Sequence, residues 1–308
     1  MSIANHFENI VISYIKAQER SRYWHLLFRS LWLVFIIAIV AVIFIQYNQS
    51  KNFLNKDHVA LIKLDGIIAS DNNVNAERIN KSLTVAFKNK STKAVILRIN
   101  SPGGSPVESD EIYQQMRYLS KKYPQVPLYA ICTDICASGG YYVASAAKNI
   151  YANAMTITGS IGVRAGGLGF VELINKIGIE RRLYTAGKDK AFLDPFQIQN
   201  PTQIADMKKI LIEAHEVFIN AIKNGRGKRL NIKYEDKIFS GVPLSGIQAK
   251  KYGLIDEFGS ITSIIENKLK GLPIVNYTQP LNMIDKISSK FGSEFSYKAE
   301  QLSKLKLQ

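Results

Sequence analysis

The chain has 308 residues, of which 46% are hydrophobic and 21% are charged. This composition excludes a disordered chain, a collagen-like repeat and a disulfide-stapled miniprotein, and the length is ample for a buried core. Lys and Arg outnumber Asp and Glu by 40 to 25, which gives a formal net charge of +15. Such a charge attracts anions nonspecifically, but the basic residues form no stripe interleaved with aromatic residues. We therefore expect no nucleic-acid partner.

The uncharged stretch at residues 30–50 predicts a single transmembrane helix. Its centre, residues 31–45, is apolar throughout, and roughly 20 helical residues cross a bilayer core of about 30 Å. No Ala-x-Ala cleavage site follows Ile45, which favours an uncleaved anchor over a signal peptide. More Lys and Arg residues flank the stretch before it than after it, so we expect the N-terminus inside and the remaining chain outside.

The sequence divides at this anchor into five segments. These are an N-terminal segment at 1–29, the anchor at 30–50, a polar linker at 51–57, a globular domain at 58–280 and a C-terminal tail at 281–308. The tail is basic and amphipathic. It is expected either to pack on the domain as a solvated helix or to contact the membrane surface.

Short β-rich runs alternate with amphipathic stretches in the domain. In chain order we expect a strand at 59–68, a helix at 76–90, a strand at 93–100, a helix at 106–122, a strand at 127–132, a helix from about 138, a strand at 150–152, a helix at 171–177, a strand at 181–184 and a long helix at 201–224 that stops at Gly225. This alternation predicts an α/β domain with a largely parallel sheet.

The histidines and cysteines limit the chemistry. Histidines occur at positions 6, 25, 58 and 215, and the first two precede the predicted anchor. His58 begins the domain and His215 lies inside the long predicted helix, so we interpret both as ordinary surface or core residues. Cys132 and Cys136 lack the nearby His or second Cys pair of a zinc site. We expect them to be two buried thiols rather than a disulfide.

Two glycine pairs, Gly103–Gly104 and Gly139–Gly140, each follow a predicted strand. Ligand sites of α/β proteins form at the carboxyl ends of parallel strands, where these pairs could present backbone N–H groups. Ser138 stands directly before the second pair and a helix start. It could be a nucleophile, with Gly139 and either Gly103 or Gly104 as an oxyanion hole. The simpler interpretation from local pattern alone is a helix N-cap, because capping serines outnumber nucleophiles.

A nucleophilic serine needs a base, and lysine can serve where burial lowers its pKa from about 10.4 towards neutrality. The best candidates lie in residues 186–195, where Gly187 follows a predicted strand and Phe192-Leu193 could desolvate an amine. Lys188 and Lys190 both qualify, and alternation places them on the same side. The local pattern does not choose between them.

Five motifs in this order resemble the signal peptide peptidase A (protease IV) family. They are Asn100-Ser-Pro-Gly-Gly104, Ala137-Ser-Gly-Gly-Tyr-Tyr142, Thr158-Gly-Ser-Ile-Gly-Val163, Gly187-Lys-Asp-Lys190 with Pro195, and Gly246-Ile-Gln-Ala249 with Gly253-Leu-Ile-Asp256. The similarity extends over about residues 59–265. It implies a Clp protease/crotonase-like fold and a Ser-Lys dyad. The chain departs from the family in Cys136 and in the additional Lys188.

The resemblance implies a role for each matching residue. Ser138 matches the family nucleophile, and Lys190 matches the general base because it precedes Pro195 by the family's spacing. Ser160 matches a serine that orients the lysine amine. Gly139 and Gly103 match the oxyanion region, with Gly104 as the neighbouring alternative.

The family also implies a setting for the reaction. Its members are plasma-membrane proteins with an extracytoplasmic catalytic domain, which degrade cleaved signal peptides and other hydrophobic peptides. They assemble as homo-oligomeric rings, and no metal or nucleotide cofactor is expected. Two alternatives remain open: a Ser-His-Asp α/β-hydrolase built from Ser138, His215 and either Asp194 or Asp206, and a non-catalytic membrane scaffold that binds peptides.

Overall fold

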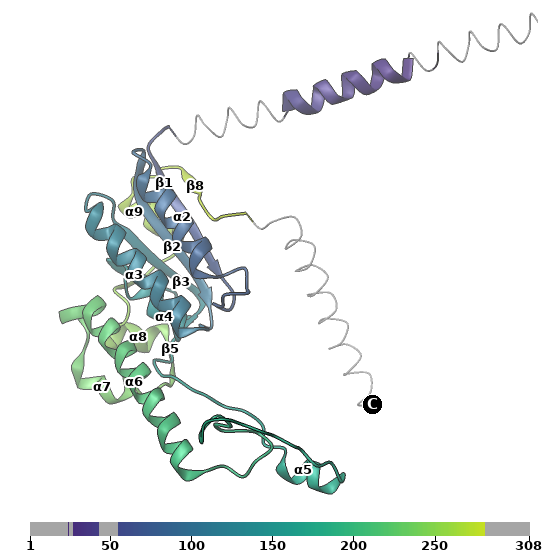
Figure 1. Cartoon of the computed structure of the whole chain (residues 1–308). Helices are drawn as coiled ribbons and strands as arrows, with labels where there is room; N and C mark the ends of the chain where they lie inside the picture. The colour runs from purple at the N-terminus through teal and green to yellow at the C-terminus, as the bar shows by residue number, and fades with distance from the viewer. Residues whose placement is uncertain (1–23, 25–26, 43–54, 281–308) are drawn as a thin grey trace, which may run out of the picture. The chain divides into compact units, whose positions relative to one another are not determined.

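The computed structural model describes residues 24, 27–42 and 55–280 (Figure 1). The predicted tail, residues 43–50 of the predicted anchor, residues 51–54 of the linker and most of the N-terminal segment lie outside the described residues. Two compact units are present, residues 1–56 and residues 57–308. In the first unit, residues 27–42 form an exposed helix. No helix within the described parts of the chain is long and apolar enough to cross a membrane.

The second unit contains one mixed sheet of eight strands, counted over the described residues. The strands are β1 (His58–Asp65), β2 (Thr92–Ser101), β3 (Leu128–Ala137), β4 (Asn149–Ala152), β5 (Ile157–Gly159), β6 (Pro243–Ser245), β7 (Glu257–Phe258) and β8 (Ile274–Asn276). The main path runs β6-β5-β3-β2-β1-β8, and β4 joins β3 to β7. All pairs are parallel except β5 with β6. The expected α/β class with a largely parallel sheet is confirmed.

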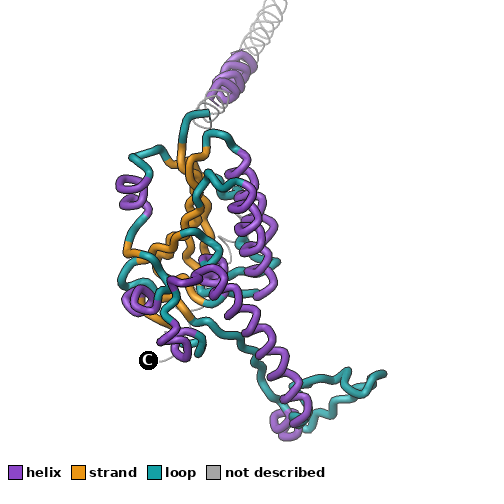
Figure 2. Tube along the Cα trace, turned by 90° about the vertical axis from the view of Figure 1, so that its left-hand side faces the viewer, coloured by secondary structure: helices purple, strands orange, loops and turns teal. Residues whose placement is uncertain are grey.

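Helices connect these strands (Figure 2). They are α2 (Ala76–Lys88), α3 (Pro106–Lys122), α4 (Gly139–Ala144), α5 (Val171–Lys176), α6 (Pro201–Arg226), α7 (Glu235–Ile238), α8 (Gly246–Tyr252) and α9 (Ile261–Lys268). The bounds of α3 agree with the prediction because the sequence marks the start of this helix with a capping serine and a proline. The Ser105 side chain accepts a hydrogen bond from the N–H of Glu108, and Pro106 occupies the first turn.

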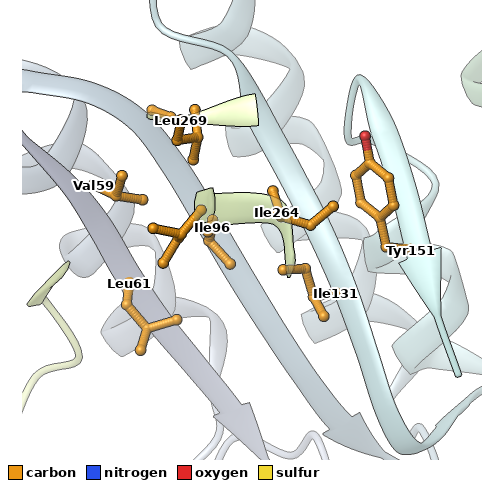
Figure 3. Close-up of a cluster of buried hydrophobic side chains, with 9 residues drawn as sticks. Val59, Leu61, Ile96, Ile131, Tyr151, Ile264 and Leu269 are labelled. Carbon is orange, nitrogen blue, oxygen red and sulfur yellow. The ribbon is translucent and has the colours of Figure 1, made fainter. Parts of the chain in front are cut away.

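Both faces of the sheet are covered, as the continuous apolar runs of the central strands require. On one face, alternate residues of β1 and β2 pack against α9 together with residues of β3 and β4 (Figure 3). This cluster consists of Val59, Leu61, Ala94, Ile96, Ile131, Tyr151, Ile264, Ile265 and Leu269. Helix α2 packs against β1 and β2 and also against α3. The core therefore fixes the central strands whose ends carry the glycine pairs.

Two predicted elements end at different residues in the structure, and a third does not form. The first strand ends at Asp65, because Gly66 turns the chain with a φ of +114°. No strand forms at residues 181–184, which are exposed and pair with none of the strands of the described sheet. Helix α6 does not stop at Gly225 but continues to Arg226. A Cβ at Gly225 would overlap the carbonyl oxygen of Ser145, so this glycine permits close packing and does not end the helix.

Strand β3 is longer than expected and carries a β-bulge directly before the candidate nucleophile. Ile99 on β2 lies opposite Cys132, but Ser101 lies opposite Cys136, so extra residues of β3 loop outward. The bulge brings the two cysteine Cα atoms to 5.4 Å, and the cysteines form a disulfide. The expectation of two separate thiols is wrong, because the spacing alone does not reveal the bulge that folds the strand back.

Residues 163–200 form an arm that extends from the sheet between β5 and α6, with α5 near its tip (Figures 1 and 2). A small contact set holds the arm together. Phe170 and Phe196 stack at 5.3 Å, and the Arg181 guanidinium lies 4.8 Å from the Phe196 ring centre. Arg181 also pairs with Asp194. The arm is therefore organised locally even though most of its side chains are exposed.

A buried ion pair joins α6 to the loop before β7. The Arg226 side chain is fully buried and donates to both carboxylate oxygens of Asp256, at 2.9 and 3.0 Å. The N–H of Ile150 donates to the same carboxylate at 2.7 Å. Burial acts to raise the pKa of Asp256, but these hydrogen bonds and the positive charge of Arg226 outweigh it and hold the pKa below its ordinary value.

Asp256→Asn is expected to lower the free energy of unfolding by about 3–5 kcal/mol at pH 7, because Arg226 is left as an uncompensated buried charge. The folded-state pKa of Asp256 is depressed, so its contribution is present above the unfolded pKa of about 3.9 and is lost as pH falls through the lower folded value. Chemical denaturation of the full chain at pH 7 and at pH 3 measures this difference.

The exposed pair of Asp57 with Lys93, at 3.1 Å, supplies the matched control. Asp57→Asn should change the unfolding free energy by less than about 1 kcal/mol at either pH. An Asp256→Asn penalty that is the same at both pH values would contradict the assignment, since the contribution of the wild-type carboxylate should already be smaller at pH 3 than at pH 7.

Candidate active site

Ser138 occupies the sharp turn from β3 into α4. Its φ of +52° and ψ of −125° are unusual for a residue other than glycine, and this kind of backbone strain is concentrated at functional sites. The residue stands at the N-cap position of α4, yet its side chain makes no capping hydrogen bond in the described structure. The residue is half-buried. A strained strand-to-helix turn is the geometry that exposes the nucleophilic serine of α/β-hydrolases.

The two glycine pairs lie against each other at this turn. A Cβ added to Gly103 would stand 2.7 Å from the backbone nitrogen of Gly139 and 2.8 Å from the Cβ of Ser138. A Cβ added to Gly139 would lie 3.3 Å from the nitrogen of Gly104. The loop after β2 and the start of α4 are therefore in direct contact, which only residues without side chains allow. This contact places backbone N–H groups from both loops beside Ser138.

The two glycines of the first pair differ in what their N–H groups do. The N–H of Gly103 donates to the Ser101 hydroxyl at 3.1 Å. Its carbonyl accepts from the N–H of Ile68 at 2.9 Å, and the Ile68 carbonyl accepts from Ser105 at 2.8 Å. Both the N–H and the carbonyl of Gly103 are thus hydrogen-bonded within its own part of the fold. The Gly104 nitrogen lies against the Cα of Gly139 and donates no hydrogen bond within the described structure.

Two buried serines that the sequence did not single out shape this loop contact. Ser101 and Ser109 are both fully buried. The Ser101 hydroxyl accepts from Gly103, and the Ser109 hydroxyl packs on the Cα of Gly139 while it donates to the Ser105 carbonyl at 2.8 Å. Ser101 belongs to a recognised motif and could have been found there. Ser109 has no local signal, because its contact is with a helix 30 residues later in the chain.

Ser160 lies on the segment that runs beside the nucleophile. The N–H of Ser138 donates to the Gly159 carbonyl at 2.9 Å, and the Thr158 hydroxyl donates to the Cys136 carbonyl at 2.7 Å. Ser160 itself has a φ of +50°, and its N–H donates to the Val242 carbonyl at 2.9 Å. The structure thus brings Ser160 next to the turn that carries Ser138.

The structure does not bring Lys190 to Ser138 within one chain. Lys190 lies on the arm, in a turn closed by its own N–H donating to the Gly187 carbonyl at 3.1 Å. All of residues 181–190 are exposed. Lys188 is also on the arm, with a side chain 93% exposed that lies 4.0 Å from the carboxylate of Asp189. Neither lysine is desolvated in the described structure.

The Ser-His-Asp alternative is not assembled either. The Nε2 atom of His215 lies 3.0 Å from the Ile161 carbonyl oxygen, and Asp194 bonds instead to Arg181 and to the N–H of Phe196. His58 is fully buried and lies 2.9 Å from the Tyr277 hydroxyl. Both described histidines therefore have partners elsewhere in the fold.

A hydrogen bond from Tyr142 to Asp110 connects α4 to α3. The Tyr142 hydroxyl donates to Asp110 of α3 at 2.7 Å, and the Tyr142 ring packs 4.9 Å from the ring of Phe218 on α6. Burial first, and then the hydrogen bond to the Asp110 carboxylate, raise the pKa of Tyr142 well above its ordinary value. The phenol thus stays protonated and locks α4 to α3 and α6, which fixes the helix that begins at Gly139.

This architecture, a mixed α/β sheet with glycine loops at the ends of its central strands, is that of the Clp protease class. Residues 49–160 match the family model described as Clp protease. Residues 120–273, half of the chain, match the model described as Peptidase family S49. The chain belongs to peptidase family S49 and carries a serine peptidase domain. The expected resemblance to signal peptide peptidase A is confirmed at the level of this family.

Named relatives include two proteases. The chain is 28% identical over 232 residues to the "Putative signal peptide peptidase SppA" of Enterococcus faecium, covering 71% of this chain and 66% of that protein. It is 28% identical over 255 residues to the "Serine protease SPPA, chloroplastic" of Arabidopsis thaliana, covering 77% of this chain and 37% of that protein.

A third relative carries a different name. The chain is 42% identical over 183 residues to the "Na(+)/H(+) antiporter NhaA" of Brucella melitensis, covering 59% of this chain and 24% of that protein. The chain therefore spans between a quarter and two thirds of the length of these relatives. Their names describe longer proteins.

Proposed function

We propose that the chain is a serine endopeptidase that cleaves hydrophobic peptides through a Ser138–Lys190 dyad. The observation that carries the proposal is the turn at Ser138. Its hydroxyl is uncommitted by capping, its backbone is strained, and N–H groups from two glycine loops lie beside it. A catalytically silent scaffold would not need a strained serine at this position.

The chemistry follows from these groups. A neutral Lys190 amine takes the proton of the Ser138 hydroxyl as its oxygen attacks a peptide carbonyl, and the resulting ammonium then protonates the leaving amine. Water hydrolyses the acyl-enzyme. The Gly139 N–H is the first of α4 and has no partner within that helix, so it can donate to the oxyanion. We propose Gly104 as the second donor, because Gly103 already donates to Ser101. Ser160 orients the amine.

The exposed arm supports a homo-oligomer in which neighbouring chains complete the dyad. Leu168, Leu173, Ile177 and Ile179 are each more than half exposed on the arm. Apolar exposure on this scale is typical of a surface that a partner covers. If a second copy of the chain receives the arm, these residues become buried and Lys190 of the first chain loses its contact with water. The same Lys190 then lies beside Ser138 of the second copy. Covering the arm thus explains both the exposed apolar residues and the distant base.

The sequence before the domain supports a single-pass anchor in the plasma membrane at residues 30–50, with the N-terminus cytoplasmic and the peptidase domain outside. The name of the Enterococcus faecium relative suggests cleaved signal peptides as substrates. Such peptides are apolar and remain in the bilayer, so an anchored enzyme would meet them there.

Incubation of the purified full chain with a synthetic signal peptide in detergent micelles tests this proposal. Mass spectrometry should show cleavage within the apolar core of the peptide, and a fluorophosphonate should stop the reaction while it modifies Ser138 alone. Binding of the peptide without cleavage would instead support the scaffold alternative. Modification of a serine other than Ser138 would contradict the assignment of the nucleophile.

A further inference from the structure

The peptidase proposal leaves one polar contact beside Ser138 without a role. His215 lies on α6, half-buried, with its Nε2 atom 3.0 Å from the carbonyl oxygen of Ile161. A carbonyl oxygen only accepts hydrogen bonds, so Nε2 must carry the proton and donate it. This nitrogen therefore has no lone pair with which to act as a base. Its hydrogen bond restrains the backbone.

The segment that His215 holds is strained and close to the nucleophile. Ile161 is fully buried and directly follows Ser160, whose φ of +50° is uncommon for a residue with a side chain. A backbone in this conformation persists only where its surroundings fix it. Three hydrogen bonds do so here: Ser138 to the Gly159 carbonyl, Ser160 to the Val242 carbonyl, and His215 to the Ile161 carbonyl.

The His215 bond is the one that comes from α6. The C-terminal half of this helix packs in the body through residues such as Phe218 and Ile222, whereas Ile210 and Ile212 on its N-terminal half are more than half exposed. His215 lies where the helix reaches the body. This contact therefore joins the middle of α6, the helix that follows the arm, to the segment that carries Ser160.

We propose that His215 is a positioning residue of the active site, which holds Ser160 in its left-handed conformation through the Ile161 carbonyl. It acts through Ser160 and does not itself touch the substrate. The proposal rests on the proposed function, since Ser160 is assigned there to orient the Lys190 amine. It predicts that the Nε2–H donor matters and that the basicity of the imidazole does not.

His215→Gln and His215→Leu in the full chain separate these two properties. Gln places an N–H donor near the position of Nε2 but is not a base, and Leu has a similar size without a donor. We expect His215→Gln to keep kcat within about 3-fold of the wild type. We expect His215→Leu to lose about 10- to 100-fold in kcat with little change in KM, as small misplacements of catalytic groups do. Glu216→Gln, at the exposed neighbouring position, is the matched control.

Amide hydrogen exchange of peptides that cover residues 158–163 gives a readout independent of cleavage. His215→Leu should accelerate exchange there, and His215→Gln and Glu216→Gln should not. Equal loss of kcat in both His215 variants, to the level of Ser138→Ala, would overturn the proposal because it would make His215 the base. Unchanged exchange and unchanged kcat in His215→Leu would overturn it as well. If the wild type cleaves nothing, the proposed function fails, and the exchange measurement still decides whether His215 positions the segment.

Discussion

Ser138→Ala is expected to lower kcat for peptide cleavage by about 10⁴-fold or more, since removal of the nucleophile in serine peptidases has effects of this size. In the proposed mechanism the Ser138 hydroxyl oxygen forms the acyl-enzyme, and alanine offers no atom that could do so. Alanine and serine tolerate the φ of +52° about equally, so the fold should be retained. Initial cleavage rates of a hydrophobic peptide by the full chain in detergent measure the loss.

Ser120→Ala is a suitable control for this experiment. Ser120 lies on α3, and its hydroxyl has no hydrogen-bond partner among the described residues. Its replacement removes a hydroxyl without breaking a bond, so kcat should change by less than about 2-fold. Residual cleavage by Ser138→Ala at a tenth of the wild-type rate would mean that another residue attacks the substrate.

Lys190→Ala is expected to reduce kcat by about 10²- to 10⁴-fold, the usual contribution of a general base. Lys190→Arg should be equally inactive, because a guanidinium does not give up its proton in proteins. Lys188→Ala should stay within about 3-fold of the wild type, although both lysines are exposed on the same arm. Cleavage rates of the three variants, measured with the same peptide, distinguish the two lysines that the local pattern leaves equivalent.

The same variants report where the dyad forms. Ser138→Ala chains keep Lys190, and Lys190→Ala chains keep Ser138, so a mixed assembly contains both groups on different chains. If neighbouring chains complete the dyad, co-assembly of the two inactive variants should restore a substantial fraction of the wild-type rate. Mixtures that stay inactive, although co-assembly is confirmed by size, would place the dyad within one chain and require the arm to fold back.

The sequence predicted those parts of the fold that are encoded locally. Helix α3 has an N-cap serine, a proline in its first turn and a regular apolar face, and its predicted bounds agree with the structure. The glycine pairs were expected at strand ends, and the structure places Gly104 against Gly139. In both cases the deciding interactions lie within a few residues of the motif or follow from the general geometry of parallel sheets.

The predictions that failed depended on distant partners. Residues 181–184 have the composition of a strand, but none of the described strands pairs with them. Glycine commonly ends a helix, but Gly225 lies within α6 because only a residue without a side chain fits against Ser145. The disulfide between Cys132 and Cys136 depends on a bulge that only the pairing of β3 with β2 defines. The hydrogen bond from His215 to the Ile161 carbonyl joins residues 54 positions apart, and neither local sequence contains a pattern that predicts it.

The pairing of β1 with β8 determines when the sheet can first be completed. These strands are the first and the last in the described domain, they run parallel, and His58 contacts Tyr277 across 219 positions. Closing so long a loop is entropically costly, and contacts of this kind slow folding. The sheet cannot be completed until residue 277 has left the ribosome. A chain still in synthesis therefore lacks the last strand of its sheet.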